Sequence, residues 1–209
     1  MNIGKLCKDV RHCLDEQGLL SEIEMTIEDA LPIDERIEAL LCGAVNAIQL
    51  LLPLRYLVPT PMPIDSHEPD IQLGIGTIRL PQDFLRLGSF KMKGWKKSVH
   101  GMINDYDPEY SLQLCSATRG GLVSPVVARV DEGDCLQYFS LPKGKSPHIV
   151  EIATYIKTAI PEDITNLEMR EEAYNLLVWW LAKDVATSFQ RDTQNIENII
   201  KTTLQTYGN

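Results

Sequence analysis

The sequence lacks a long hydrophobic run, an excess of positive charge and any CxxC pair. Its most apolar stretch, residues 39–54, is interrupted by Asn46, Gln49 and Pro53 and is too short to span a bilayer. The 20 Lys and Arg stand against 29 Asp and Glu, and this formal charge of −9 opposes tight general binding of nucleic acid, which depends on neutralising phosphates. We therefore expect neither a membrane contact nor a general nucleic-acid binder.

The cysteines give no reason to expect disulfides. Their number is odd, and no secretory signal is recognised ahead of them, so reduced thiols in a cytosolic or nucleocapsid-like setting fit best. The five are Cys7, Cys13, Cys42, Cys115 and Cys135. With 44% hydrophobic and 23% charged residues, the composition is that of a globular protein, and 209 residues suit one domain, 1–209, that needs no disulfide or metal for stability.

Two helices are predicted in the first quarter of the chain. Apolar residues recur at helical spacing over 3–17, and Gly18 is a suitable residue to end that helix. A wider apolar face predicts a buried helix over 33–52, which begins after Pro32 and ends before Pro53.

The middle of the chain is predicted to be β-rich. Five prolines within 53–70 exclude a helix or a central strand there and predict an extended loop. Strands are expected beyond it at 76–80, 84–93 and 148–157, with a hairpin that pairs 123–130 with 135–141.

The last part of the chain is predicted to be helical again. A stripe of apolar residues predicts a helix over 167–189. The polar segment 190–209 either continues this helix or forms an arm that needs a partner. The predicted fold is α+β: a helical bundle from 1–52 and 161–189, an inserted antiparallel β-meander at 77–160, and a C-terminal arm at 190–209.

Charge is distributed unevenly along the chain. Residues 1–76 hold 5 basic and 13 acidic residues, residues 77–160 hold 11 and 8, and residues 161–209 hold 4 and 8. The dense basic cluster is Lys91, Lys93, Trp95, Lys96 and Lys97. It is read as a solvated strand end, as a contact for an acidic surface of another subunit, or as a phosphate contact aided by the aromatic ring.

A search for catalytic motifs finds none. Gly144-Lys145-Ser146 has Phe139 where a phosphate-binding loop needs its first glycine, and no GxSxG elbow occurs. The histidines follow no metal-binding spacing and are read as surface or turn residues; they are His12, His67, His100 and His148. We predict no catalytic residue, cofactor or metal, and an enzyme whose site is assembled at long range stays open as an alternative.

Several short sequence motifs resemble those of the head-to-tail connector proteins (adaptor, tail-accessory or tail-tubular-A-like) of tailed, especially short-tailed, bacteriophages. The resemblance covers most of residues 1–189. It lies in the second-helix phrase 31–46, in Leu-Pro-Gln-Asp-Phe-Leu-Arg-Leu at 80–87, in Gly-Asp-Cys-Leu-Gln-Tyr at 133–138, in the Val-to-Tyr spacing of 150–155, and in a long last helix with Ala173, Ala182 and Ala186.

This resemblance implies assembly rather than catalysis. Such proteins form a ring of about twelve copies between the portal and the tail and extend the DNA channel. The implied partners are further copies of the chain, the portal protein and the next tail or nozzle component, while DNA passes through without tight binding. The implied location is the neck of the virion, after assembly in the host cytoplasm.

Two sets of interface residues follow from this hypothesis. The basic cluster, Lys91 to Lys97 with Trp95, is expected to meet an acidic surface of an adjacent copy or a tail protein. The C-terminal arm is expected to dock on the portal through Ile196, Ile199, Ile200 and Leu204, so that its deletion abolishes docking without lowering thermal stability. The rival interpretation is a nucleic-acid-associated accessory protein that uses the basic β-insert.

Overall fold

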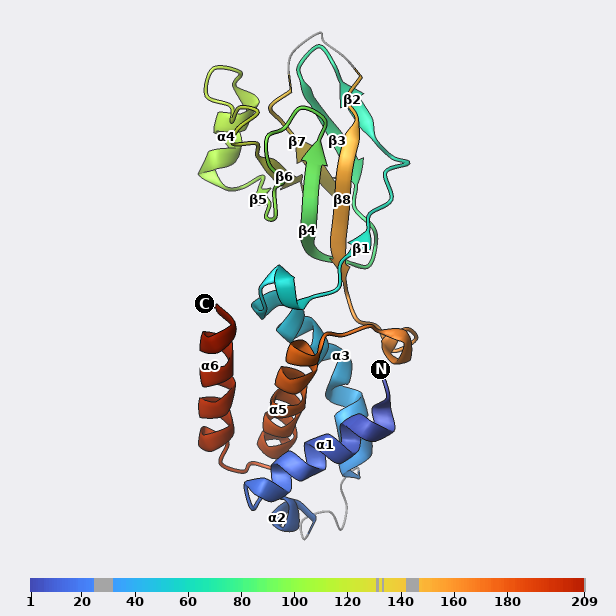
Figure 1. Ribbon diagram of the computed structural model, residues 1–209, viewed down its shortest axis with the longest axis vertical. Coiled ribbons are helices and arrows are strands. Elements are labelled where there is room, and N and C mark those ends of the chain that lie inside the picture. Colours follow the sequence, from blue (N-terminus) through green and yellow to red (C-terminus); the bar gives the residue numbers. More distant parts are fainter. Residues whose placement is uncertain (25–31, 131, 133, 142–146, 209) are drawn as a thin grey trace. The chain divides into compact units, whose positions relative to one another are not determined.

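The computed structural model in Figure 1 describes residues 1–24, 32–130, 132, 134–141 and 147–208. The chain divides into two compact units. The helical unit comprises Met1–Val58 and Thr158–Asn209, and the β unit comprises Pro59–Lys157. The predicted mixed α+β class is confirmed.

Both ends of the chain contribute helices to the helical unit, namely α1 (Ile3–Glu16), α2 (Leu20–Glu24), α3 (Ile33–Leu51), α5 (Glu171–Ser188) and α6 (Gln194–Gly208). The predictions for α1 and α3 are confirmed to within one residue, and Gly18 follows α1 with φ of +69°. Helix α5 begins later than predicted, because residues 167–170 are not helical, and Ile164–Asn166 before them forms a separate 3₁₀ turn, η3. A second 3₁₀ turn, η2, spans Leu54–Tyr56.

Helix α5 packs against α1 and α3 to form the core of the helical unit. Ala173, Ala182 and Ala186 are buried on α5, and small side chains of this kind let neighbouring helices approach closely. The apolar stripes of α1 and α3 are buried as their spacing predicts, with Leu6, Val10, Leu14, Ile37, Leu41, Val45 and Ile48 at most 1% exposed. Within the described residues, none of the helices is both long and apolar enough to cross a membrane.

All five cysteines are free thiols. Cys7 and Cys13 face the core of the helical unit, where burial raises the pKa of both and brings that of Cys13 to about 11. A thiol with a raised pKa holds little reactive thiolate at neutral pH. These two residues therefore serve as small apolar side chains.

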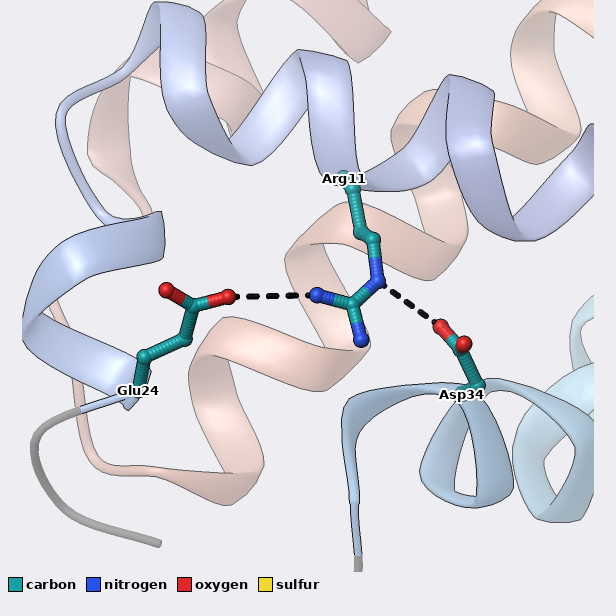
Figure 2. A network of polar contacts seen from close by, with 3 residues as sticks. All are labelled: Arg11, Glu24 and Asp34. Atoms are coloured by element: carbon teal, nitrogen blue, oxygen red, sulfur yellow. Dashed lines mark hydrogen bonds and ion pairs between the residues drawn. The ribbon is translucent and has the colours of Figure 1, made fainter.

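One arginine connects the first three helices (Figure 2). Arg11 of α1 donates from Nε to Asp34 Oδ1 at 2.8 Å and from a terminal nitrogen to Glu24 Oε1 at 3.2 Å. Asp34 also lies in the first turn of α3, where a carboxylate is favourable against the helix dipole. Because all three side chains are at least one-third exposed, each pair contributes only about 0.2–1 kcal/mol. The network mainly joins the middle of α1 to the end of α2 and the start of α3.

The C-terminal segment is an integral helix rather than an arm, which corrects the prediction for 190–209. The chain reverses at Gln190, with φ of +56°, and α6 packs back against α5 (Figure 1). Ile196 and Ile200 are only 1% and 6% exposed. The end of α6 is also held, because Arg55 donates to the carbonyl of Tyr207 at 2.6 Å and the Tyr56 and Tyr207 rings lie 4.9 Å apart. Deleting this segment would therefore uncover core residues of the helical unit.

The β unit contains two sheets where the sequence predicted one meander. One sheet has the order β1-β8-β4, from strands β1 (Thr60–Pro61), β8 (Val150–Lys157) and β4 (Phe84–Met92). The other has the order β2-β3-β7-β6-β5, from strands β2 (Glu68–Asp70), β3 (Ile75–Arg79), β7 (Cys135–Tyr138), β6 (Val127–Val130) and β5 (Ile103–Asn104). Consecutive strands β3 and β4 belong to different sheets, so β4 pairs with the distant β8 instead of with a neighbour in sequence.

The predicted hairpin is confirmed, although both of its strands, β6 and β7, are shorter than expected. Strand β6 pairs with β7 antiparallel, whereas β5 joins β6 in parallel. The proline-rich loop supplies two short edge strands, and Pro61 and Pro69 lie in them. Proline is tolerated there because an edge strand needs hydrogen bonds on one side only. The short helix α4 (Pro108–Leu114) was missed, since seven residues give too little periodicity.

Aromatic residues fill the core between the two sheets. The ring centroid of Phe90 on β4 lies 6.0 Å from that of Tyr138 on β7, with the ring planes inclined by 29°. It lies 5.8 Å from that of Trp95, edge to face. All three are at most 3% exposed. Such pairs contribute about 0.5–1.5 kcal/mol beyond the burial of their area. The core therefore joins strands from both sheets.

We expect the substitution Ile196→Ala to lower the free energy of unfolding by about 2–4 kcal/mol, because it leaves a cavity between α6 and α5. Gln205→Ala, on the exposed face of the same helix, is the matched control and should change it by less than about 0.5 kcal/mol. Chemical denaturation followed by circular dichroism measures both. Equal stability of the two variants would show that α6 is a free arm after all.

Candidate functional site

The basic cluster predicted from the sequence lies on a turn that follows β4. Gly94, with φ of +98°, adopts a left-handed conformation that favours glycine, and it reverses the chain. Lys93, Lys96 and Lys97 are exposed on this turn, whereas Trp95 points into the core and is 3% exposed. The expected role of Trp95 in an interface is therefore wrong, since its ring anchors the turn from inside.

Backbone hydrogen bonds hold the turn to two other segments. The N–H of Lys93 donates to the carbonyl of Ile149 at 2.8 Å, and the N–H of Lys96 donates to the carbonyl of Leu122 at 2.9 Å. Val99 and Phe90 exchange two further bonds of 2.9 Å. The three exposed lysines thus extend from a backbone that is fixed on both sides.

Lys91 differs from the other lysines of the cluster. It lies on β4, and its ammonium pairs with Glu151 Oε2 at 2.8 Å. In the part of the chain that the structure describes, Lys93, Lys96 and Lys97 have no such carboxylate partner. The five predicted residues therefore separate into one core residue, one paired cation and three cations that are open to a partner.

Exposed aliphatic side chains lie beside the three lysines. Ile149 is 42% exposed, and Val123, which follows the acceptor Leu122, is 67% exposed. We call Lys93, Lys96, Lys97, Val123 and Ile149 the lysine patch. Apolar residues with a charged rim are typical of a protein interface. The patch can bind an anionic, partly apolar surface.

A largely buried hydrogen-bonded cluster fixes the segment that leads into β8, next to Ile149 of this patch. His67 Nε2 lies 2.8 Å from Tyr138 Oη, and His148 Nδ1 lies 2.9 Å from the same oxygen. Tyr138 is fully buried and His148 is 8% exposed. We call these three residues the histidine clasp. It connects the loop between β1 and β2 to β7 and to the segment before β8, directly next to Ile149 of the patch.

The clasp favours neutral imidazoles. A phenol has one proton, so one ring accepts it while the other donates its N–H to the oxygen. Burial lowers the pKa of His67 and of His148; repulsion by His67 lowers the pKa of His148 further, and the nearby carboxylate of Asp70 raises it. Burial also raises the pKa of Tyr138 far above its usual range. If both rings were protonated, the hydroxyl proton would lose its acceptor.

Sequence reasoning missed this cluster. His67 and His148 were read as surface or turn residues, and for His148 the burial shows that this was wrong. The two histidines stand far apart in the sequence and neither forms a spaced motif, so no local signal could have found them. Only the pairing of the sheets places both beside Tyr138.

The second predicted set lies on α6 and is divided by burial. Ile196 and Ile200 pack inside the helical unit, whereas Ile199 and Leu204 are half-buried. Leu204 lines a shallow groove of about 450 Å³ beside Trp180, over whose ring Lys183 Nζ lies at 4.2 Å. Only Ile199 and Leu204 of this set are accessible to a partner.

No metal-binding group of three His, Cys, Asp or Glu residues occurs in the described ranges. Gly144, Lys145 and Ser146, the remnant of a phosphate-loop pattern, lie outside the described residues. A comparison with models of known protein families finds no match, and a search of curated proteins finds none either.

We expect the β unit to lose stability as pH falls from 7.5 to 5.5. Both clasp histidines have a lower pKa in the folded chain than the ordinary value of about 6.5, so the unfolded chain binds more protons and acid favours unfolding. Thermal unfolding midpoints measured across this range should fall less steeply in the variant His67→Gln/His148→Gln. His12→Gln, at an exposed position, is the control. If the unfolding midpoint changes with pH as steeply in the double variant as in this control, the role of the clasp is contradicted.

Gly76 of β3 is expected to be indispensable for the clasp. A Cβ at this position would collide with the ring and hydroxyl of Tyr138. Gly76→Ala should therefore lower the free energy of unfolding by about 2–3 kcal/mol. Gly121→Ala has open space around it and should change stability by less than about 0.5 kcal/mol, as measured by the same denaturant titration.

Proposed function

We propose that the protein is a structural component of a tailed-bacteriophage virion, a connector that forms a ring between portal and tail and extends the DNA channel. The observation that carries this proposal is how charge divides between the two units. The helical unit holds 9 Lys and Arg against 18 Asp and Glu, whereas the β unit holds 11 of each. The entire net charge of −9 therefore belongs to the helical unit.

This division suits a conduit for DNA. An acidic wall repels phosphates, so DNA passes without being arrested by tight contacts. The sequence motifs at 80–87, 133–138 and 150–155, which resemble those of connector proteins, belong to the β unit. The proposed partners are further copies of the chain in a ring of about twelve, the portal protein and the next tail component. The proposed place is the neck of the virion, and the role requires no catalysis or cofactor.

The packing of α6 changes how the portal contact is proposed. Because Ile196 and Ile200 stabilise the helical unit, a portal would meet the outward face of α6 instead of capturing a free arm. Ile199 and Leu204 are the half-exposed apolar residues of the predicted set on that helix. The portal contact is thus proposed for a preformed helical surface, which needs no ordering on binding.

A nucleic-acid-associated accessory function is the second candidate, because Lys93, Lys96 and Lys97 are exposed and close together. Two features weigh against it. The β unit as a whole is neutral, and Trp95 is buried, so the patch contains no exposed aromatic ring on which a base could stack. The lysines alone would give weak binding that depends strongly on salt.

We expect negative-stain images of the purified protein, mixed with the portal protein encoded by the same genome, to show rings attached to the portal. Binding to duplex DNA, measured by fluorescence anisotropy in parallel, should be weak. The rival function predicts no rings and a DNA affinity that falls with salt with a slope of about −0.9 for each phosphate contacted. That pair of results would refute the connector.

A further inference from the structure

The lysine patch is a one-sided surface whose chemistry defines its partner. Its three ammonium groups are without carboxylates among the described residues, and Val123 and Ile149, on the segments hydrogen-bonded to this turn, expose apolar area. Cations of this kind fit carboxylates or phosphates, but the exposed aliphatic area fits only a partner that also offers apolar side chains. A protein surface meets both conditions better than a nucleic-acid backbone.

The helical unit contains a surface with the opposite properties. An open hollow of about 780 Å³ is lined by five such residues, the apolar Val58, Leu167 and Met169 and the carboxylates Glu168 and Glu171, and also by Asp9, Lys5 and the N-terminal amine of Met1, which donates to the carbonyl of Leu167. Both glutamates are exposed, and no cation pairs with them within the described chain. We call these five residues the acidic hollow.

A third carboxylate of the hollow is already satisfied. Asp9 accepts a hydrogen bond of 2.6 Å from Tyr174 Oη and lies 3.9 Å from Lys5 Nζ. The contrast identifies Glu168 and Glu171 as the charges left for a partner. Glu162, Asp163 and Glu172 extend the same negative segment against a single Arg170.

We propose that the lysine patch of one copy docks on the acidic hollow of a second copy of this chain. Lys93, Lys96 and Lys97 then face the glutamates at the rim, and Val123 and Ile149 cover apolar area of the hollow. This inference rests on the proposed function only in naming a second copy as the partner. Because the two surfaces differ, the contact is heterologous: each copy uses both surfaces, and repetition builds a ring or a filament.

Charge reversal tests the pairing in an informative way. Lys93→Glu/Lys96→Glu/Lys97→Glu makes both surfaces acidic, and Glu168→Lys/Glu171→Lys makes both basic. Each variant alone places like charges across the contact and should fail to self-associate. A one-to-one mixture restores opposite charges at every contact, so association should return only when the two variants are mixed.

The measurement is zero-length carbodiimide cross-linking, which joins a lysine to a carboxylate only when they touch. Wild-type protein is used as an equal mixture of unlabelled and ¹⁵N-labelled chains at the highest soluble concentration. We expect mass spectrometry to find mixed-isotope cross-links between residues 93–97 and 168–171. Neither variant alone can form these cross-links, because residues 93–97 and 168–171 then carry the same functional group. The mixture of variants should form them again, between chains of different isotope only, and sedimentation velocity should show self-association lost in each variant alone and regained in the mixture.

A control variant separates a specific contact from net charge. Asp15→Lys/Glu16→Lys reverses two exposed carboxylates in the last turn of α1, away from the hollow, and should leave the cross-links unchanged. Thermal unfolding of all variants checks that each one folds. Absence of the mixed-isotope cross-links, same-isotope products only, or no recovery in the mixture would overturn the inference.

The outcome also distinguishes this contact from the proposed function. Portal-bound rings that lack these cross-links would refute the pairing of patch and hollow while the connector function stands. Cross-links that appear and respond to charge reversal, in a protein that never binds a portal, would support the pairing and refute the connector.

Discussion

The β unit depends on the burial of one hydroxyl group, that of Tyr138. Its ring stacks near Phe90 across the two sheets, and its oxygen lies between the rings of His67 and His148. Leaving this oxygen buried without partners would cost about 1–3 kcal/mol, and the hydrogen bonds to the two histidines avoid that cost. Because His148 directly precedes Ile149, the same contact fixes the carbonyl that anchors Lys93. The exposed lysine patch therefore depends on polar contacts in the core.

The helical unit has a different basis for its stability. Segments from the two ends of the chain bury long apolar stripes against α5, and its polar connections, such as Arg11 with Glu24 and Asp34, are half-exposed. Its surface carries the net negative charge of the protein. Packing thus supplies the stability, which leaves exposed carboxylates such as Glu168 and Glu171 available for association with a cationic surface.

Patterns that repeat within one element were predictable. The stripes of α1 and α3 and the hairpin of β6 and β7 follow from residues close in sequence. The sheet pairing was not, because alternation shows that a segment is a strand but not which strand it meets. Trp95 illustrates the same limit. A tryptophan among lysines suggests an exposed cluster, yet its ring packs edge to face against the buried ring of Phe90.

The sequence by itself determined the α+β class, the bounds of α1 and α3, the acidic character of both ends and the location of the basic cluster. Each of these depends on local composition or on short-range periodicity. Only the tertiary structure decided which lysines are open to a partner, that α6 belongs to the core, and that two distant histidines share one tyrosine. Those features depend on contacts between residues far apart along the chain, and such contacts follow from how the elements pack rather than from the spacing within them.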